Sequence, residues 1–218
     1  MYIYGMPVFL DEQVFTNARL GVWQVDEPVE YFLQRLPLTE DESTLISGMR
    51  EPNRLEWLAS RYLLDHICGH PERIDTVTDT HGKPHLVGRP EEISLSHSGT
   101  YVAAMLGIRD VGVDIQLCKD KILRLEHKFA RPEESERIDR DHALIHLHVL
   151  WGAKETLYKI YARKQLHFIR HLHVDLPEHL SDRGAFSGNI TISGETIDCI
   201  LEYHIFKPYV LVYGQSIA

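Results

Sequence analysis

Three short segments in the middle of the chain, each bounded by glycine and rich in β-branched residues, limit the fold most: EISLSHSG, YVAAMLGI and VGVDIQ. They predict successive strands of an antiparallel sheet. Helical patterns lie on either side, at residues 53–68, with Gly69 as the C-cap, and at residues 139–162. Strand patterns return in GNITISG, CILEYHIF and YVLVYG. Helix and sheet in both halves predict an α+β protein of two similar lobes.

The composition limits location and partners. The 218 residues, 44% of them hydrophobic, can bury a core in one domain or in two lobes. No run approaches the ~20 apolar residues of a membrane span and the first residues lack a secretory signal, so we expect a cytoplasmic protein without membrane contact. A net charge of −9 argues against nucleic-acid binding. The cysteines are scattered, which predicts reduced thiols: Cys68, Cys118 and Cys199.

The stretch WGAKETLYK, residues 151–159, places charges beside an apolar helical stripe. Residues three or four apart share a face of a helix. One stripe then holds Leu147, Leu150, Lys154, Leu157 and Tyr161, and the stripe beside it holds Trp151, Glu155 and Lys159. Taken alone, the pattern is also explained by an ion pair on a solvated face, worth ~0.2–0.5 kcal/mol. Lys154 would then lie along its apolar neighbours.

Two histidines of the same predicted helix, His142 and His146, have the four-residue spacing that can chelate a metal ion. The glutamate of an HExxH motif is absent, His148 lies on another face, and no acidic ligand is near in sequence. A zinc site here is therefore the minor alternative, because a metal site needs a converging third ligand.

Alternation in VGVDIQ places Gly112, Asp114 and Gln116 on one face of a strand. A hard cation such as Mg²⁺ prefers oxygen ligands, few of them from protein. Asp114 would supply one carboxylate and Gln116 a carbonyl oxygen. A second carboxylate must come from elsewhere, and Glu155 is the candidate.

Neighbouring residues of a strand point to opposite faces, so Ser96 and His97 of SLSHSG are not expected to form a nucleophile–base pair. His97 is better explained as a donor to an anionic oxygen, with Lys83 of the HGKP turn as a second cation. A strand of solvated polar residues explains the pattern equally well.

The ordered set G-K-P, S-H-S, G-V-D-I and W-G-A-K-E-T-L-Y-K closely resembles the 4′-phosphopantetheinyl transferases of the surfactin-synthetase-activating type. The resemblance extends from about Arg54 to the final strands. It implies a pseudo-twofold two-lobed α+β fold, each lobe a helix packed on a small antiparallel sheet. Residues 1–112 would form the N-terminal lobe and residues 113–218 the C-terminal lobe with the metal motifs, and the active site would lie in the cleft between them.

The resemblance also implies an activity. A monomer would transfer 4′-phosphopantetheine from coenzyme A to a serine of an acyl or peptidyl carrier protein, releasing 3′,5′-ADP. Mg²⁺ would be the cofactor, with Mn²⁺ as an alternative, and coenzyme A the substrate. Two other hypotheses stay open at this point: a non-catalytic relative that binds coenzyme A or a carrier protein, and a histidine-based metallohydrolase.

Roles follow residue by residue from the resemblance. The metal would be held by Asp114, Glu155 and Gln116, although the family usually has glutamate where this chain has Gln116. Glu155 would also be the base for the carrier serine. The pyrophosphate would be contacted by Lys159, His97 and a hydroxyl of Ser96 or Ser98. The 3′-phosphoadenosine end would be held by Lys83 and by Arg61 or Arg54. Lys154 would span the edge of the site, and Trp151 would position the helix.

An enzyme of this net charge needs a local docking surface for acidic carrier proteins. The segment KILRLEHKFARPEE, residues 121–134, has a helical pattern and is the candidate. Its exposed contacts would be Lys121, Arg124, Lys128 and Phe129. The alternative is an ordinary solvated helix and loop.

Overall fold

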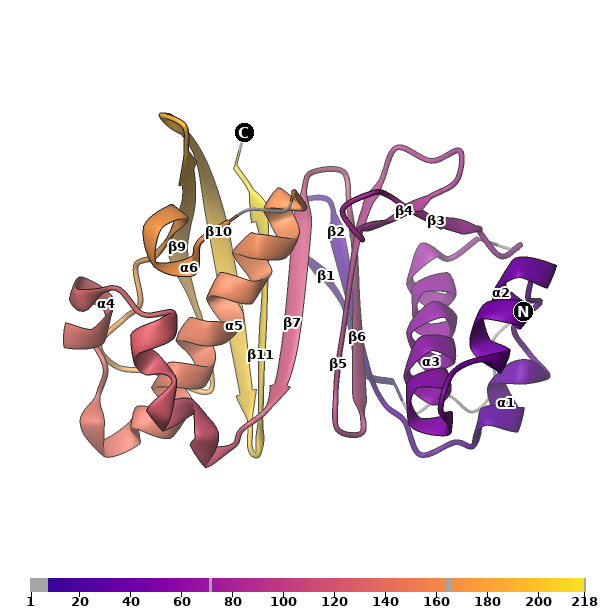
Figure 1. The fold of residues 1–218 in the computed structure, drawn as a ribbon, viewed down its shortest axis with the longest axis horizontal. Coiled ribbons are helices and arrows are strands. Elements are labelled where there is room, and N and C mark those ends of the chain that lie inside the picture. The colour runs from indigo at the N-terminus through magenta and orange to yellow at the C-terminus, as the bar shows by residue number, and fades with distance from the viewer. Residues whose placement is uncertain (1–7, 71, 164–165, 218) are drawn as a thin grey trace.

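The computed structural model describes residues 8–70, 72–163 and 166–217 (Figure 1). Two antiparallel sheets form the middle layers, and one long helix covers the outer face of each sheet (Figure 1). The prediction of an α+β protein is confirmed. The pseudo-twofold relation of two transferase lobes stays a prediction.

The first sheet has the order β1-β2-β6-β5. Its strands are β1 (Val8–Val14), β2 (Ala18–Gln24), β6 (Tyr101–Gly107) and β5 (Glu92–Ser98). Helix α3 (Glu51–Cys68) packs against it, beside α1 (Val29–Leu33) and α2 (Glu40–Ser47), and a small hairpin is formed by β3 (Thr76–Thr78) and β4 (Pro84–Leu86). Gly69 ends α3 with a φ of 62°, so the predicted helix and its C-cap are confirmed.

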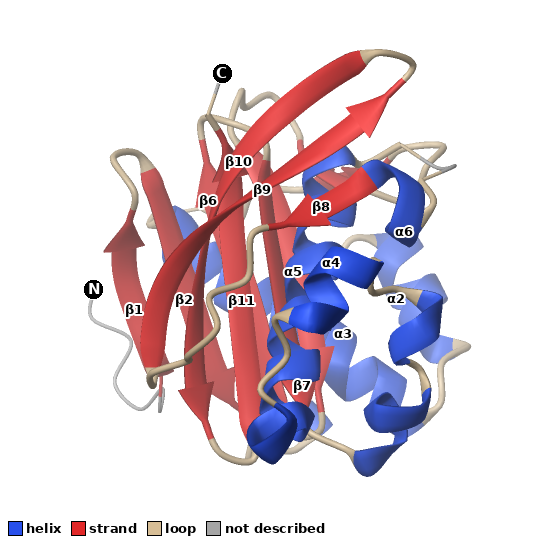
Figure 2. Ribbon diagram, turned by 90° about the vertical axis from the view of Figure 1, so that its left-hand side faces the viewer, coloured by secondary structure: helices blue, strands red, loops and turns tan. Residues whose placement is uncertain are grey.

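The second sheet has the order β7-β11-β10-β9-β8. Its strands are β7 (Val111–Leu117), β11 (Tyr209–Ser216), β10 (Glu195–Phe206), β9 (Arg183–Ile192) and β8 (Leu172–Val174). Helix α5 (Ala143–Tyr161) packs on β7 and β11, which confirms the predicted long helix. The late strands are confirmed too, and the β9–β10 hairpin projects past its neighbours (Figure 2).

The connection between β7 and α5 is less regular than its sequence pattern suggested. It contains only short turns and one short helix: η1 (Asp120–Arg124), η2 (Glu126–Lys128), α4 (Pro132–Glu136) and η3 (Arg140–His142). Another short helix, α6 (Phe168–His171), follows α5. The segment predicted as a helix near residue 121 is therefore two 3₁₀ turns.

Three apolar clusters hold the layers together. One lies between α3 and the first sheet, a second between α5 and the second sheet, and a third between the two sheets. Strand alternation divides the side chains among them, since Val113 faces the other sheet whereas Asp114 lies on the α5 side of β7. The third cluster joins the halves into one folded unit.

The prediction of three successive strands in one sheet is wrong for the third. Strands β5 and β6 pair with each other, but β7 pairs with β11 and begins the second sheet. The predicted lobe boundary after residue 112 falls inside β7. No helix in the described ranges is long and apolar enough to cross a membrane.

Candidate functional site

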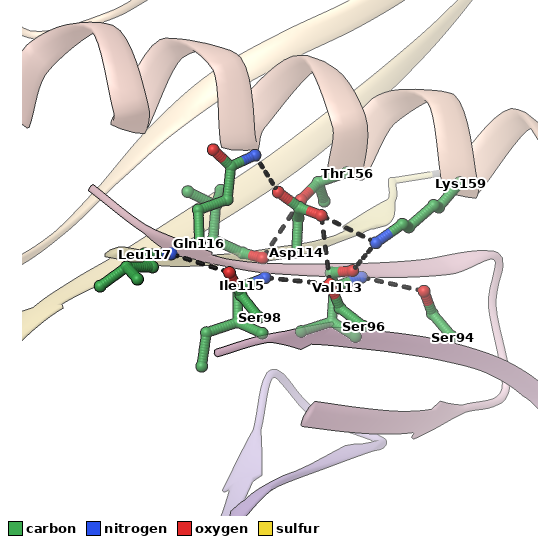
Figure 3. Close-up of polar contacts among 11 residues, drawn as sticks. Ser94, Ser96, Ser98, Val113, Asp114, Ile115, Gln116, Leu117, Thr156 and Lys159 are labelled. Carbon is green, nitrogen blue, oxygen red and sulfur yellow. Dashed lines mark hydrogen bonds and ion pairs between the residues drawn. The ribbon is translucent and has the colours of Figure 1, made fainter. Parts of the chain in front are cut away.

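Serine side chains join the two sheets where β5 lies beside β7 (Figure 3). Every second residue of β5 in this stretch is a serine whose Oγ accepts a backbone N–H of β7. The pairs are Ser94 with Val113 at 3.0 Å, Ser96 with Ile115 at 3.1 Å, and Ser98 with Leu117 at 2.9 Å. Hydroxyl groups thus satisfy the N–H groups that β7 turns away from β11. This row of contacts fixes the register of β7, and with it the position of Asp114.

Two glycines let α5 approach the second sheet closely. A Cβ atom on Gly112 would lie 2.3 Å from the backbone oxygen of Thr156, and one on Gly152 would lie 2.9 Å from Val212 Cγ2. The Thr156 hydroxyl donates to the Val212 carbonyl at 3.1 Å. These contacts place the Glu155 side of the helix beside Asp114, so the glycines of GVDI and WGAKE have a packing role.

The Asp114 carboxylate is buried and accepts three hydrogen bonds (Figure 3). Its Oδ1 accepts from Ser96 Oγ at 3.2 Å and from Lys159 Nζ at 2.9 Å, and its Oδ2 accepts from Gln116 Nε2 at 2.6 Å. Lys159 Nζ also donates to the Val113 carbonyl at 2.7 Å. Four of the predicted site residues are therefore brought into direct contact.

Glu155 is the second carboxylate of this cluster. The pKa of Glu155 is raised to about 7, mainly by burial and also by the negative charge of Asp114, while Lys159 opposes the shift. The described residues offer the Glu155 carboxylate no hydrogen bond or ion pair. Asp114 and Glu155 together carry more negative charge than Lys159 neutralises, which favours a bound cation.

The donor set fits a hard divalent cation. Asp114 of β7 and Glu155 of α5 are close enough to interact electrostatically. Mg²⁺ commonly takes one or two carboxylates and completes its shell with water and substrate oxygens. Within the described ranges no three histidine, cysteine or acidic side chains converge as a fuller ligand set.

Gln116 differs from its predicted role. Its amide nitrogen points to Asp114 and the amide oxygen turns away (Figure 3). A carboxylate attracts the NH₂ end of the amide, so Gln116 is a hydrogen-bond donor to Asp114 here and its amide oxygen does not face that carboxylate.

A cavity of ≈ 190 Å³ lies between the two halves, next to this cluster. The β3–β4 turn and β5 line one side, and the carboxyl end of α5 lines the other, including Lys83, Ser94, Lys159 and Arg163. The Lys83 ammonium lies 2.6 Å from Glu92 Oε2. Lys83 therefore lines this cavity with its charge already paired, and the assignment of the cavity as the active-site cleft between two lobes stays a prediction.

Ser96 and His97 point to opposite faces, as predicted. Ser96 faces Asp114, whereas the His97 ring is half exposed and its Nδ1 lies 3.2 Å from Glu56 of α3. The hydroxyls of Ser96 and Ser98 both accept hydrogen bonds from backbone N–H groups of β7, so they connect the two sheets.

Lys154 does not reach the cleft, and its predicted place at the edge of the site is wrong. Its side chain is 0% exposed, and Nζ lies 2.6 Å from Glu134 Oε2. It also donates to the carbonyls of Phe168 at 3.2 Å and Leu172 at 3.1 Å. The apolar stripe of α5 carries Lys154 into the core, where a buried carboxylate compensates its charge.

The two arginines predicted for the adenosine end have other partners. Arg54 Nε donates to the Ile46 carbonyl at 3.0 Å, near the end of α2. The Arg61 guanidinium lies 4.7 Å from the centre of the Trp57 ring, and burial lowers its pKa to about 10. Neither arginine lines the cavity between the halves.

The three cations predicted for the docking segment after β7 are exposed: Lys121, Arg124 and Lys128. Phe129 was expected to be exposed and is 1% exposed, because its ring packs edge-on against Trp151 at 5.0 Å. Trp151 also stacks on Phe168 at 5.2 Å and so anchors α5 to α6. An apolar groove of ≈ 280 Å³ remains here, lined by Gln116, Lys121, Lys128, Phe129 and Trp151 among others.

The two histidines of the alternative zinc site both contact Asp139, whose backbone N–H donates to His146 Nδ1 at 3.4 Å, but they differ in burial. The His142 side chain is 71% exposed and its Nδ1 lies 2.9 Å from Asp139, whereas His146 is buried. Burial lowers the pKa of His146. The described part of the chain has no three-ligand cluster at this place, so the geometry gives the zinc hypothesis no support.

The interpretation of the sequence overlooked Ser94, Gly112 and Gly152. The alternation of serines in SLSHS was the signal for the joint, and small residues at facing positions of a strand and a helix were the signal for close packing. Both signals can be interpreted only when the two elements are known to be neighbours.

Comparison with known proteins gives no assignment. No protein-family model matches the chain, and the curated proteins contain no significant match to it. The functional hypothesis therefore depends on the residues and their geometry.

Proposed function

We propose that this protein transfers 4′-phosphopantetheine from coenzyme A to a serine of an acyl or peptidyl carrier protein, with Mg²⁺ as the cofactor. One observation carries the proposal: Asp114 and Glu155 belong to facing elements and both interact with Lys159, which lines a cavity between the two halves. Paired carboxylates and a lysine are the groups that hold a divalent cation and a pyrophosphate together.

Asp114 and Glu155 would hold the ion, which supplies neutralisation of negative charge on the pyrophosphate when bound. Lys159 would act on the same charge; this is supported by the contact of its ammonium with Asp114 and by its place in the cavity lining. Its side chain is 26% exposed, so it can reach a ligand. Mn²⁺ would fit the same oxygen donors.

Glu155 would take the proton of the carrier serine. A carboxylate beside the serine hydroxyl can act as the general base for its proton. The serine oxygen forms a bond to the β-phosphorus of coenzyme A, the bond from that phosphorus to the bridging oxygen breaks, and 3′,5′-ADP leaves. Loss of the proton strengthens the serine as a nucleophile.

The groove beside Gln116 would dock the carrier protein. Its lining is apolar around Phe129 and Trp151, and Lys121 and Lys128 supply positive charge to a chain whose net charge is −9. Acidic carrier proteins with an apolar contact residue are complementary to such a surface.

Intact-mass measurement tests the function directly. An apo acyl carrier protein and an apo peptidyl carrier protein are each incubated with this protein, coenzyme A and Mg²⁺, and parallel samples contain EDTA. We expect the mass of one phosphopantetheine to be added only in the samples with free Mg²⁺. No gain on either carrier would contradict the proposal.

A binding-only relative is the second candidate, and Gln116 favours it. The amide donates to Asp114, where a third carboxylate would add a further anionic ligand. Such a protein would bind coenzyme A and release no 3′,5′-ADP, so assaying release beside binding separates the two candidates.

A further inference from the structure

Two buried histidines of α5 hold the connecting segment, residues 119–139 between β7 and α5, at both of its ends. The backbone N–H of Lys119 donates to His148 Nε2 at 3.2 Å, and the backbone N–H of Asp139 donates to His146 Nδ1 at 3.4 Å. His148 is 3% exposed and His146 is 2% exposed. Residues two positions apart leave a helix about 200° apart, so the two ends are held at different faces of α5. The proposed function gives these histidines no role.

The hydrogen bonds of His148 determine its protonation state. Its Nδ1 lies 2.8 Å from the carbonyl oxygen of Leu144, which can only accept, so Nδ1 carries a proton. Its Nε2 faces the N–H of Lys119, which can only donate, so Nε2 carries none. The attached state therefore requires a neutral ring. A second proton, on Nε2, would replace this hydrogen bond by two N–H groups that face each other.

His146 meets the same requirement at the other end of the connecting segment. Its Nδ1 accepts from the backbone of Asp139, so only a neutral ring with its proton on Nε2 fits. Burial is the main cause of the lowered pKa of His146; His142 and His179 also lower it, and Asp139 raises it. The cavity of ≈ 260 Å³ beside this ring is also lined by two further charged residues, Asp182 and Lys207.

The surroundings of His148 also disfavour a charged ring. Among the described residues that line its groove, the charged side chains are those of Lys119, Lys121 and Lys128. Burial lowers the pKa of His148, although the hydrogen bond to Leu144 opposes the shift. A histidine whose ring is freed from such contacts takes up a proton near about pH 6.5. The released segment thus binds protons more readily than the attached one, so acid favours release.

We propose that His146 and His148 are positioning residues that hold the connecting segment against α5 when they are neutral and release it when they are protonated. The segment supplies Lys121, Lys128 and Phe129 to the groove beside Gln116. Release would disrupt this groove, so carrier proteins would bind more weakly at acidic pH. That consequence rests on the proposed function, whereas the release depends only on the contacts of the two histidines.

Hydrogen–deuterium exchange with mass spectrometry tests the release without carrier protein or coenzyme A. Peptides that cover residues 119–139 are compared at about pH 7.5 and about pH 5, with labelling times scaled for the intrinsic pH dependence of exchange. The wild type should lose protection in these peptides about tenfold at the lower pH, because one unit of pKa shift changes the opening equilibrium tenfold. Peptides from β10 and β11 should keep their protection.

Variants separate protonation from packing. His148→Gln and His146→Asn each offer an amide oxygen near the accepting ring nitrogen and cannot be charged, so the double variant should stay protected at both pH values. His148→Ala should lose protection near Lys119 at both. His127→Gln, at an exposed histidine within the same segment, is the matched control and should behave as the wild type. Equal protection of the wild type at both pH values, or a pH-dependent loss that persists in the double variant, overturns the inference.

NMR of the wild type keeps the test valid if a variant fails to fold. Near neutral pH the ring nitrogens should show the Nδ1–H tautomer for His148 and the Nε2–H tautomer for His146. The amide signals of Lys119 and Asp139 should move as these rings titrate. A charged ring at neutral pH, or amide signals that do not follow the titration, overturns the inference. Failure of the wild type to transfer phosphopantetheine would contradict the proposed function and leave this result unaffected.

Discussion

Helix α5 carries two lysine–carboxylate pairs that differ in what surrounds them. Lys154 and Glu134 lie 2.6 Å apart with side chains 0% and 1% exposed, whereas Lys159 and Asp114 lie 2.9 Å apart with side chains 26% and 9% exposed. Glu134 also accepts the backbone N–H groups of Arg131 at 2.8 Å and Val174 at 2.9 Å. The buried pair is charge-balanced and fully hydrogen-bonded. The other pair has Glu155 beside it as an additional carboxylate.

This difference separates a structural ion pair from a candidate active site. In a balanced pair in the core every polar atom is already hydrogen-bonded, so the pair cannot bind a ligand. Its removal affects the stability of the fold. A pair with a surplus carboxylate at the edge of a cavity attracts a cation and destabilises the empty protein. Substitution of Lys154 should therefore change mainly the stability of the protein, and substitution of Glu155 mainly its activity.

The largest effect on stability is expected for Lys154→Met. The change leaves Glu134 as a buried charge without its partner, and the free energy of unfolding should fall by about 3–5 kcal/mol. Urea denaturation measures the loss. The double variant Lys154→Met, Glu134→Leu should recover much of it, because it removes both charges. A single variant as stable as the wild type would show that the pair is not structural.

Glu155→Gln should have the opposite effects, with a large loss of activity and no loss of stability. Transfer to a carrier protein should fall by about 10²–10⁴-fold, because the base and one metal ligand are lost. The free energy of unfolding should stay equal or rise, since a buried carboxylate beside Asp114 is removed. Transfer kinetics and urea denaturation are measured on the same samples. Glu178→Gln, at an exposed glutamate, is the control. Wild-type turnover in Glu155→Gln would exclude Glu155 as the base.

The sequence predicts which face of α5 each charged residue occupies, but it does not predict which distant residue each one contacts. Helical periodicity places Lys154 in the apolar stripe and Glu155 and Lys159 beside it, and all three positions are correct. Nothing near Lys154 in sequence identifies Glu134, since the two meet only when α4 and β8 close over α5. The assignment of Lys154 to the cleft failed for this reason.

The serine contacts between β5 and β7 could not be predicted for the same reason: they join residues that are far apart in sequence. Strand alternation predicts that Ser94, Ser96 and Ser98 share a face, but not that this face meets an edge of another sheet. The strand pattern of VGVDIQ is equally compatible with pairing to β6 or to β11. The choice depends on contacts between residues far apart in sequence, which periodicity does not report.

Ser94→Ala tests the joint that positions Asp114. It leaves the buried N–H of Val113 without its acceptor, and the free energy of unfolding should fall by about 1–3 kcal/mol. Ser98→Ala is the comparison at the less buried end of the row, and its loss should be smaller. Equal stability of Ser94→Ala and the wild type in urea would mean that another acceptor replaces the serine.

The titration of Glu155 should give a smaller, pH-dependent effect. Its pKa is about 7 in the folded chain and near 4.5 when unfolded. Between these values the folded chain binds more protons than the unfolded chain, so the free energy of unfolding falls as pH rises through this window. Glu155→Gln lacks this slope. The stability difference between variant and wild type should therefore grow from pH 5 to about pH 7 and then level off. Parallel urea midpoints across this range would show that Glu155 is not a surplus charge.

Gln116→Glu is expected to have the smallest effect, a change in the Mg²⁺ requirement of the Asp114 and Glu155 cluster. The amide now donates to Asp114, and a carboxylate at the same position would add a third negative charge to a cluster that already exceeds its cations. Mg²⁺ affinity should rise, and the Mg²⁺ concentration for half-maximal transfer should fall about three- to tenfold. The empty variant should be less stable than the wild type, because the added charge repels Asp114 and Glu155 until a cation binds. Gln116→Met separates the two roles of the amide, since it removes the donor to Asp114 without adding charge. An unchanged Mg²⁺ requirement in Gln116→Glu would contradict this prediction and would mean that position 116 does not contribute to cation binding.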